Sequence, residues 1–177
     1  KMGIVDLPVP CNDHIKPFIE NNVPNLWTYY CCGQCIGVSN RLIAMPSWRN
    51  RSIGMQMYKY DIVGFLHWGY NFYYGKLSTH PINPYLVNDT DGAFPAGDAF
   101  SVYPGPKGAW PSLRLKVFLE AIQDRRALKL LEGYIGKDEV VKLIEAEGLV
   151  DFFNYPSDAH YLLRLREAVN QKIKELL

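Results

Sequence analysis

The apolar run from Ile62 to Trp68 is the feature of this sequence that most limits how the chain can fold. It reads IVGFLHW and is nearly continuous in apolar residues, as expected for a strand that is buried on both faces. Such strands belong to parallel sheets whose faces are covered by helices. We predict three further short strands, over residues 4–9, 26–31 and 100–103.

Helices are predicted between and after these strands. A short helix over 12–22 would be capped by Asn12 or Asp13, and a longer one covers 48–60. From Ser112 the pattern becomes helical to the end of the chain, with breaks near Gly136 and before Ser157. The last of these helices has apolar residues spaced by three and four, which indicates a packing face: Leu162, Leu165, Val169, Ile173 and Leu176.

The alternation of strands and helices implies parallel strands joined by crossovers. Four such strands could form a small open sheet. They could also form half of an eight-stranded barrel, which normally needs about 250 residues. The pattern alone leaves both architectures open.

Charge and hydropathy exclude several classes of partner. A net charge of +1 gives no reason to expect nucleic acid or a membrane surface. No stretch approaches the roughly 20 apolar residues of a membrane span, and no signal peptide is visible.

The sequence begins at Lys1 with what reads as a strand, so we expect a fragment of a longer protein. No phosphate-binding loop or cluster of histidines suggests a cofactor.

The cysteines allow two interpretations. Cys32 and Cys35 have C-x-x-C spacing, which can serve zinc or redox chemistry. A structural zinc site needs four ligands, and Cys31 and Cys11 could supply the others, but no second pair repeats the spacing. We favour reduced, packed thiols over a metal site or a disulfide, and therefore expect a cytoplasmic location.

The connection from Trp68 to Gly97 is the candidate site. It spans about 30 residues without a clear helix, and loops of that length are usually functional or disordered. Its density of aromatic residues argues for order. Aromatic side chains in a loop after a parallel strand can line a sugar pocket, and Trp68 and Tyr70 are the first candidates. The alternative is that these rings form a small core beneath the loop.

Catalytic groups are harder to find. Glycoside hydrolysis normally uses two carboxyl groups, and no two of the candidate aspartates form a convincing pair: Asp6, Asp89, Asp91 and Asp98. Asp138 and Glu139 open a predicted helix, where they interact favourably with the helix dipole. His67 lies within a strand and is expected to be a hydrogen-bonded core residue. The helical arginines are expected to form ion pairs, although Arg114 is close enough to the fourth strand to reach a pocket.

Six motifs occur in an order that resembles a known family. They are Trp48-Arg49-Asn50-Arg51, the segment 64–71 (GFLHWGYN), the segment 94–98 (FPAGD), Tyr103-Pro104-Gly105, Ser112-Leu113-Arg114 and the segment 123–128 (QDRRAL). Together they resemble the C-terminal part of the domain-of-unknown-function family 4091, over roughly residues 4–132. That family is similar to the family-123 glycoside hydrolases, which act on N-acetylgalactosaminides.

The resemblance implies an α/β fold in which this chain is the C-terminal half of a (β/α)8 barrel. Residues 1–135 would form the half-barrel, and residues 136–177 a helical extension packed on it. Relatives with known activity use a neighbouring Asp-Glu pair, which lies upstream of the matched region and has no equivalent here. The expected sugar-contacting residues at the strand ends are Tyr30, Trp68, Tyr70, Asn71, Asp98 and Tyr103.

Three functions remain open at this point. The first is a glycoside hydrolase-like protein for N-acetylhexosamine-type sugars, whose catalytic pair lies outside this chain. The second is a carbohydrate-binding module without chemistry. The third is a structural fragment that self-associates or pairs with a missing N-terminal half, since an open half-barrel exposes sheet edges.

Overall fold

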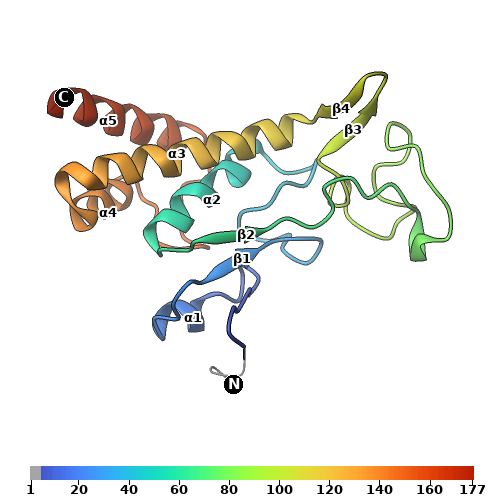
Figure 1. The fold of residues 1–177 in the computed structure, drawn as a ribbon, viewed down its shortest axis with the longest axis horizontal. Coiled ribbons are helices and arrows are strands. Elements are labelled where there is room, and N and C mark those ends of the chain that lie inside the picture. The colour runs from blue at the N-terminus through green and yellow to red at the C-terminus, as the bar shows by residue number, and fades with distance from the viewer. Residues whose placement is uncertain (1–4) are drawn as a thin grey trace.

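The computed structural model describes residues 5–177, which form a mixed α/β structure (Figure 1). The helices are α1 Lys16–Glu20, α2 Ser47–Lys59, α3 Leu113–Ile135, α4 Lys137–Ala146 and α5 His160–Leu176, with a 3-10 turn at Lys76–Ser78. The strands are β1 Trp27–Tyr29, β2 Gly64–Leu66, β3 Val102–Gly105 and β4 Gly108–Pro111. Helices α4 and α5 lie at one end, the β3–β4 hairpin with the long loop before it lies at the other, and α3 runs between the two.

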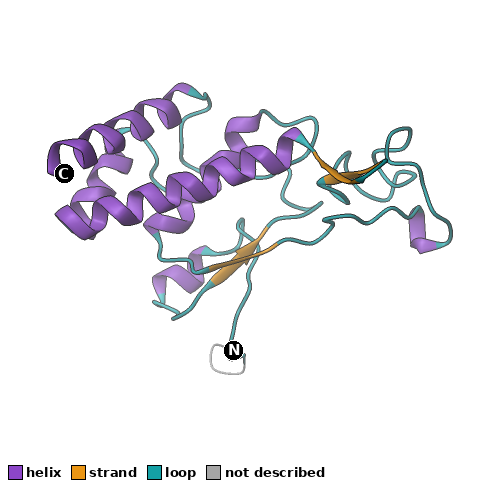
Figure 2. Ribbon diagram, turned by 45° about the horizontal axis from the view of Figure 1, so that its top comes forward, coloured by secondary structure: helices purple, strands orange, loops and turns teal. Residues whose placement is uncertain are grey.

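Strands β1 and β2 form a parallel pair, as predicted, with α2 in the crossover between them. Their register places Trp27 opposite Gly64 and Tyr29 opposite Leu66. Both strands are shorter than predicted. Figure 2 shows that loop occupies most of the chain between β2 and β3.

The predicted strand over residues 4–9 is wrong as a regular strand, and Ile4 lies outside the described residues. The segment nevertheless follows β1: the carbonyl oxygens of Pro8 and Pro10 accept from the backbone of β1, at 3.4 and 3.3 Å. An isolated parallel bridge joins Cys11 to Tyr29. Because proline has no N–H to donate, the two prolines prevent a regular ladder here.

The fourth predicted strand does not join the parallel sheet. β3 pairs antiparallel with β4, with Gly105 opposite Gly108, so the turn consists of Pro106 and Lys107. A two-residue connection allows only an antiparallel pair. The described residues therefore form two two-stranded sheets in place of the predicted run of four parallel strands, and the half-barrel architecture is not seen in them.

Helices were predicted more accurately than strands. Ser112 caps α3 by accepting from the backbone N–H of Leu115 at 3.2 Å, and Gly136 follows its last residue. The predicted cap of α1 is wrong, because the helix begins after Ile15. The side chain of Asn12 instead donates to the carbonyl oxygen of Ser39 at 2.8 Å.

The main core lies between α2, α3, α4 and α5. Four residues of the α5 face are confirmed as packing residues: Leu162, Leu165 and Val169 are buried, and Ile173 packs against them. A buried ion-pair network joins three helices, since Asp124 of α3 bonds Arg51 of α2 at 2.7 Å and Arg166 of α5 at 2.9 Å. In the described part of the chain, no helix combines the length and apolar character needed to cross a membrane.

Candidate functional site

The candidate site lies where β1 and β2 end. Because Tyr29 and Leu66 are partners in register, the next residues, Tyr30 and His67, lie at the same edge of the sheet. Carboxyl ends of parallel strands are where α/β proteins bind ligands. The long loop leaves this edge at Trp68 and returns to it at Asp98.

Arg41, which the sequence analysis did not single out, joins these segments. It is fully buried, and its Nη2 donates to the backbone carbonyl oxygens of Trp68 and Asp98, both at 2.8 Å. The same nitrogen lies 4.0 Å from Oδ1 of Asp98. Its guanidinium carbon is 5.3 Å from the ring centroid of Tyr30. Three of the predicted site residues, Tyr30, Trp68 and Asp98, therefore contact the same buried guanidinium group.

Asp98 and Tyr30 are both fully buried, so neither side chain reaches the surface in this structure. Burial raises the pKa of Asp98 above its ordinary value, and the positive charge of Arg41 opposes that shift. Burial also raises the pKa of Tyr30, whose hydroxyl donates to Oδ1 of Asn50 at 2.7 Å. These two residues lie buried beneath the strand ends, and their contact with sugar stays a prediction.

Several buried polar atoms at this edge have no hydrogen-bond partner among the described residues. They are both carboxylate oxygens of Asp98, Nε1 of Trp68, Nδ1 of His67, and Nε and Nη1 of Arg41. Buried polar atoms in folded proteins are nearly always paired. These atoms are inaccessible to solvent, so they form a buried polar cluster beneath the ends of the parallel strands.

His67 is neutral at physiological pH. Burial lowers the pKa of its imidazole to about 4, and the charge of Arg41 acts in the same direction. The ring packs against three aromatic rings, those of Phe65, Tyr70 and Phe118, at centroid distances of 5.8 to 6.1 Å. Its Nε2 lies 3.3 Å from Oγ of Ser101. These contacts agree in part with the prediction of a hydrogen-bonded core histidine, because the side chain is only partly buried and its Nδ1 has no partner among the described residues.

Trp68 belongs to an aromatic cluster inside the long loop. Its ring contacts Phe94 at 4.9 Å and Phe72 at 6.0 Å between centroids, and Phe72 continues the cluster to Tyr74. The rings thus form the small core that was one of the two interpretations of the loop. Trp68 is partly exposed, so its contact with a sugar stays a prediction.

Tyr70 and Asn71 lie on the surface beside this cluster. Both are exposed, and the backbone of each is fixed by the segment that returns from the loop. Tyr70 accepts from the backbone N–H of Ser101 at 2.9 Å, and Asn71 forms an isolated bridge with Phe100. Their side chains reach solvent, and their contact with a sugar stays a prediction.

Tyr103 lies apart from the other candidates, on the β3–β4 hairpin. Its ring is 5.2 Å from that of Tyr85, and in register it faces Trp110, which the sequence analysis did not consider. The three aromatic residues line a surface hollow of about 430 Å³. Tyr85 and Trp110 are each about half exposed.

Arg114 fixes the end of the long loop from α3. Its Nη2 donates to the carbonyl oxygen of Phe100 at 2.8 Å, and its Nη1 donates to that of Gly97. Its proximity to the fourth strand suggested that it could reach a pocket. In the structure its guanidinium bonds the backbone next to the site.

Comparison with known proteins identifies the family. A family model described as the catalytic domain of glycoside hydrolase 123 matches residues 1–131, about three quarters of the chain. A search of curated proteins found no match. The matched residues include the two parallel strands, the buried Arg41 and the aromatic loop. By this match, the chain belongs to the glycoside hydrolase 123 family through its catalytic domain.

Proposed function

We propose that this chain is the C-terminal portion of a glycoside hydrolase that acts on N-acetylhexosamine-type carbohydrates. The observation that carries the proposal is the site at the ends of β1 and β2, in a chain matched by a glycoside hydrolase catalytic domain. Trp68 and Tyr70 offer ring surface to the apolar face of a sugar. The exposed side-chain amide of Asn71 offers hydrogen bonds to its hydroxyl groups.

The catalytic carboxyl pair belongs, in this proposal, to a part of the polypeptide outside this chain. Glycoside hydrolysis needs two carboxyl groups on either side of the scissile bond. Asp98 is buried against Arg41, and Asp13 bonds His14 and Gln34, so both are engaged in other contacts. The remaining strands of a (β/α)8 barrel would supply the pair and cover the open side of β1 and β2.

An activity assay tests this proposal. We expect the full-length polypeptide to cleave aryl N-acetylhexosaminides, and this chain alone to be inactive. In the full-length protein, Trp68→Ala should lower kcat/KM by about tenfold or more, because loss of a stacked ring costs about 1–3 kcal/mol. A full-length protein that is inactive on a broad panel of glycosides would contradict the proposal.

A second candidate function is carbohydrate binding without chemistry, favoured by the aromatic hollow around Tyr85, Tyr103 and Trp110. Titration of the full chain with N-acetylgalactosamine, N-acetylglucosamine and simple hexoses, followed by tryptophan fluorescence, would detect binding. Quenching that Trp110→Ala removes and Trp68→Ala leaves intact would favour the hollow. The opposite pattern would place the sugar at the strand ends.

A further inference from the structure

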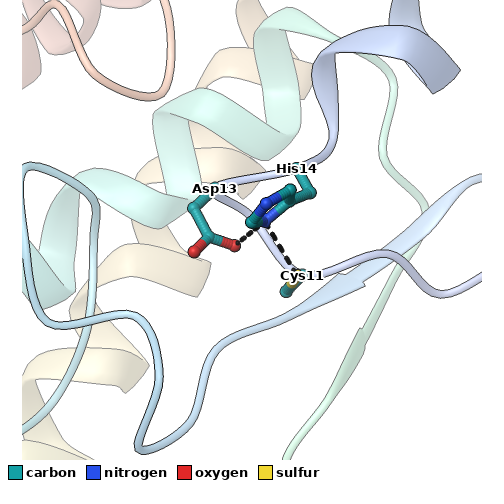
Figure 3. Close-up of side chains that lie close together, drawn as sticks. All are labelled: Cys11, Asp13 and His14. Carbon is teal, nitrogen blue, oxygen red and sulfur yellow. Dashed lines mark hydrogen bonds and ion pairs between the residues drawn. The ribbon is translucent and has the colours of Figure 1, made fainter.

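Three potential metal ligands meet at the start of the chain, in the turn that follows Cys11. Figure 3 shows the thiol of Cys11, the carboxylate of Asp13 and the imidazole of His14 converging. Their ligand atoms all lie within 4.8 Å of one another. Nδ1 of His14 is 3.5 Å from Sγ of Cys11 and 2.9 Å from Oδ1 of Asp13.

The two separations from Nδ1 of His14 are close to those of a tetrahedral zinc site. With zinc–nitrogen, zinc–sulfur and zinc–oxygen bonds of ordinary length, tetrahedral angles place nitrogen about 3.6 Å from sulfur and about 3.4 Å from oxygen. The 3.5 Å between Sγ of Cys11 and Nδ1 of His14 already matches the nitrogen–sulfur value. The second requires the carboxylate of Asp13 to move outward by about half an ångström.

The surroundings favour this arrangement. Gln34 donates from Nε2 to both carboxylate oxygens of Asp13, at 3.1 and 3.2 Å, which fixes the orientation of that ligand. Its Oε1 accepts from the backbone N–H of Cys31 at 2.9 Å, so the turn is tied to the end of β1. The side chain of His14 is 78% exposed, which leaves the site open to an ion from solvent.

The chemistry of the donors selects the kind of ion. A thiolate with an imidazole and a carboxylate suits zinc and similar transition metals, whereas magnesium and calcium prefer oxygen ligands alone. Three protein ligands leave a fourth tetrahedral position for water. The pair of His80 and Asp91, 2.7 Å apart, lacks a thiol and provides a matched comparison elsewhere in the molecule.

We propose that Cys11, Asp13 and His14 form a binding site for one zinc ion. The sequence suggested Cys11 only as a ligand that could complete a site at the C-x-x-C motif, whereas the structure brings it together with Asp13 and His14. The ion would take the place of the contacts that Nδ1 of His14 makes with Cys11 and Asp13. It would hold the turn after Cys11 at the edge of the sheet where the proposed sugar site lies. This proposal does not depend on the glycosidase activity.

Titration of the full chain with zinc, followed by calorimetry, tests the proposal. We expect one ion per chain, and a melting temperature that rises with zinc concentration, because an ion that binds only the folded state stabilises it. Cobalt in place of zinc should give a thiolate-to-cobalt charge-transfer absorption. Cys11→Ser should abolish that absorption, and both Cys11→Ser and His14→Ala should weaken binding about tenfold or more.

Two controls separate this site from the alternatives. His80→Ala removes the comparison histidine, and the double variant Cys32→Ser, Cys35→Ser removes the C-x-x-C motif; both should bind zinc as the unmodified chain does. Circular dichroism would establish that each variant folds. Failure of the folded, unmodified chain to bind zinc would overturn the proposal. The proposal would also be overturned if zinc bound unchanged to Cys11→Ser and His14→Ala. It would be overturned as well if the double variant Cys32→Ser, Cys35→Ser no longer bound zinc.

Discussion

The buried pair of Arg41 and Asp98 is the residue-scale feature with the clearest energetic consequence. Both side chains are removed from water, and removal of one partner leaves the other as an isolated buried charge. We expect Asp98→Ala to lower the free energy of unfolding by about 3–5 kcal/mol, measured by urea denaturation. The double variant Arg41→Met, Asp98→Ala should be less destabilised than the sum of the two single variants. Additive losses would contradict a direct coupling between the two charges.

His67 gives a residue-scale prediction for pH. Its pKa is lowered to about 4 in the folded chain and returns to about 6.5 on unfolding. Between these values the unfolded chain binds a proton that the folded chain does not. The free energy of unfolding should therefore fall as pH decreases from about 6.5 to 4, by up to about 3 kcal/mol.

The variant His67→Gln should flatten this slope, measured by urea denaturation at several pH values. Asp98, whose pKa is raised, acts with the opposite sign, so the difference between the unmodified chain and His67→Gln isolates the histidine. His160→Gln is the matched control, because that imidazole is exposed. An unchanged slope in His67→Gln would contradict the buried, neutral histidine.

At the scale of elements, the contact between α2 and α3 depends on Gly54. A methyl group at this position would overlap the backbone carbonyl oxygen of Ala121, which cannot move without shifting α3. We expect Gly54→Ala to destabilise the chain by about 1–3 kcal/mol or more, measured by thermal unfolding. Gly133→Ala in α3 is the control, because no atom lies within 4 Å of its added methyl group. The control should be neutral or stabilising by about 0.5–1 kcal/mol. If Gly54→Ala and Gly133→Ala changed the stability equally, helix propensity and not packing would determine the effect of both substitutions.

Local signals explain which elements could be predicted from the sequence. Helix α5 follows its predicted apolar repeat, and Ser112 and Gly136 are the residues that flank α3, as predicted. The partner of a strand is a non-local property. The sequence of β3 is compatible with a parallel or an antiparallel partner, so it does not show which one the strand takes. The two-residue turn at Pro106 and Lys107 makes β3 pair antiparallel with β4.

The same distinction applies to the candidate site. The aromatic loop was recognisable because its length and composition are unusual for a connection. Arg41 was missed because it bonds backbone carbonyl oxygens 27 and 57 residues away, and every residue carries such an oxygen. Cys11, Asp13 and His14 are close in sequence, but only the fold shows that their ligand atoms converge.

On the scale of the whole molecule, the chain is packed unevenly. The helical end has a continuous core, whereas the parallel sheet has two strands among residues 5–177. Parallel strands are normally covered on both faces and paired at their edges. Val63 is 53% exposed and Leu66 is 49% exposed, so this part of the sheet presents apolar surface to solvent. Further strands of the same protein, or a second copy of the chain, would cover it.

The final prediction follows from this exposed strand. We expect the chain alone to self-associate as its concentration rises in sedimentation velocity experiments, because β2 offers both apolar side chains and unpaired backbone groups. Leu66→Lys should weaken the association by placing a charge on that strand. Leu163→Lys, on α5, is the matched control, because Leu163 is 54% exposed and lies on the helical side of the molecule. A chain that stays monomeric at every concentration, or two variants that associate equally, would contradict a role for β2. If a longer polypeptide that contains this chain is monomeric while this chain associates through Leu66, that result would support the proposed barrel, whose further strands would cover this surface.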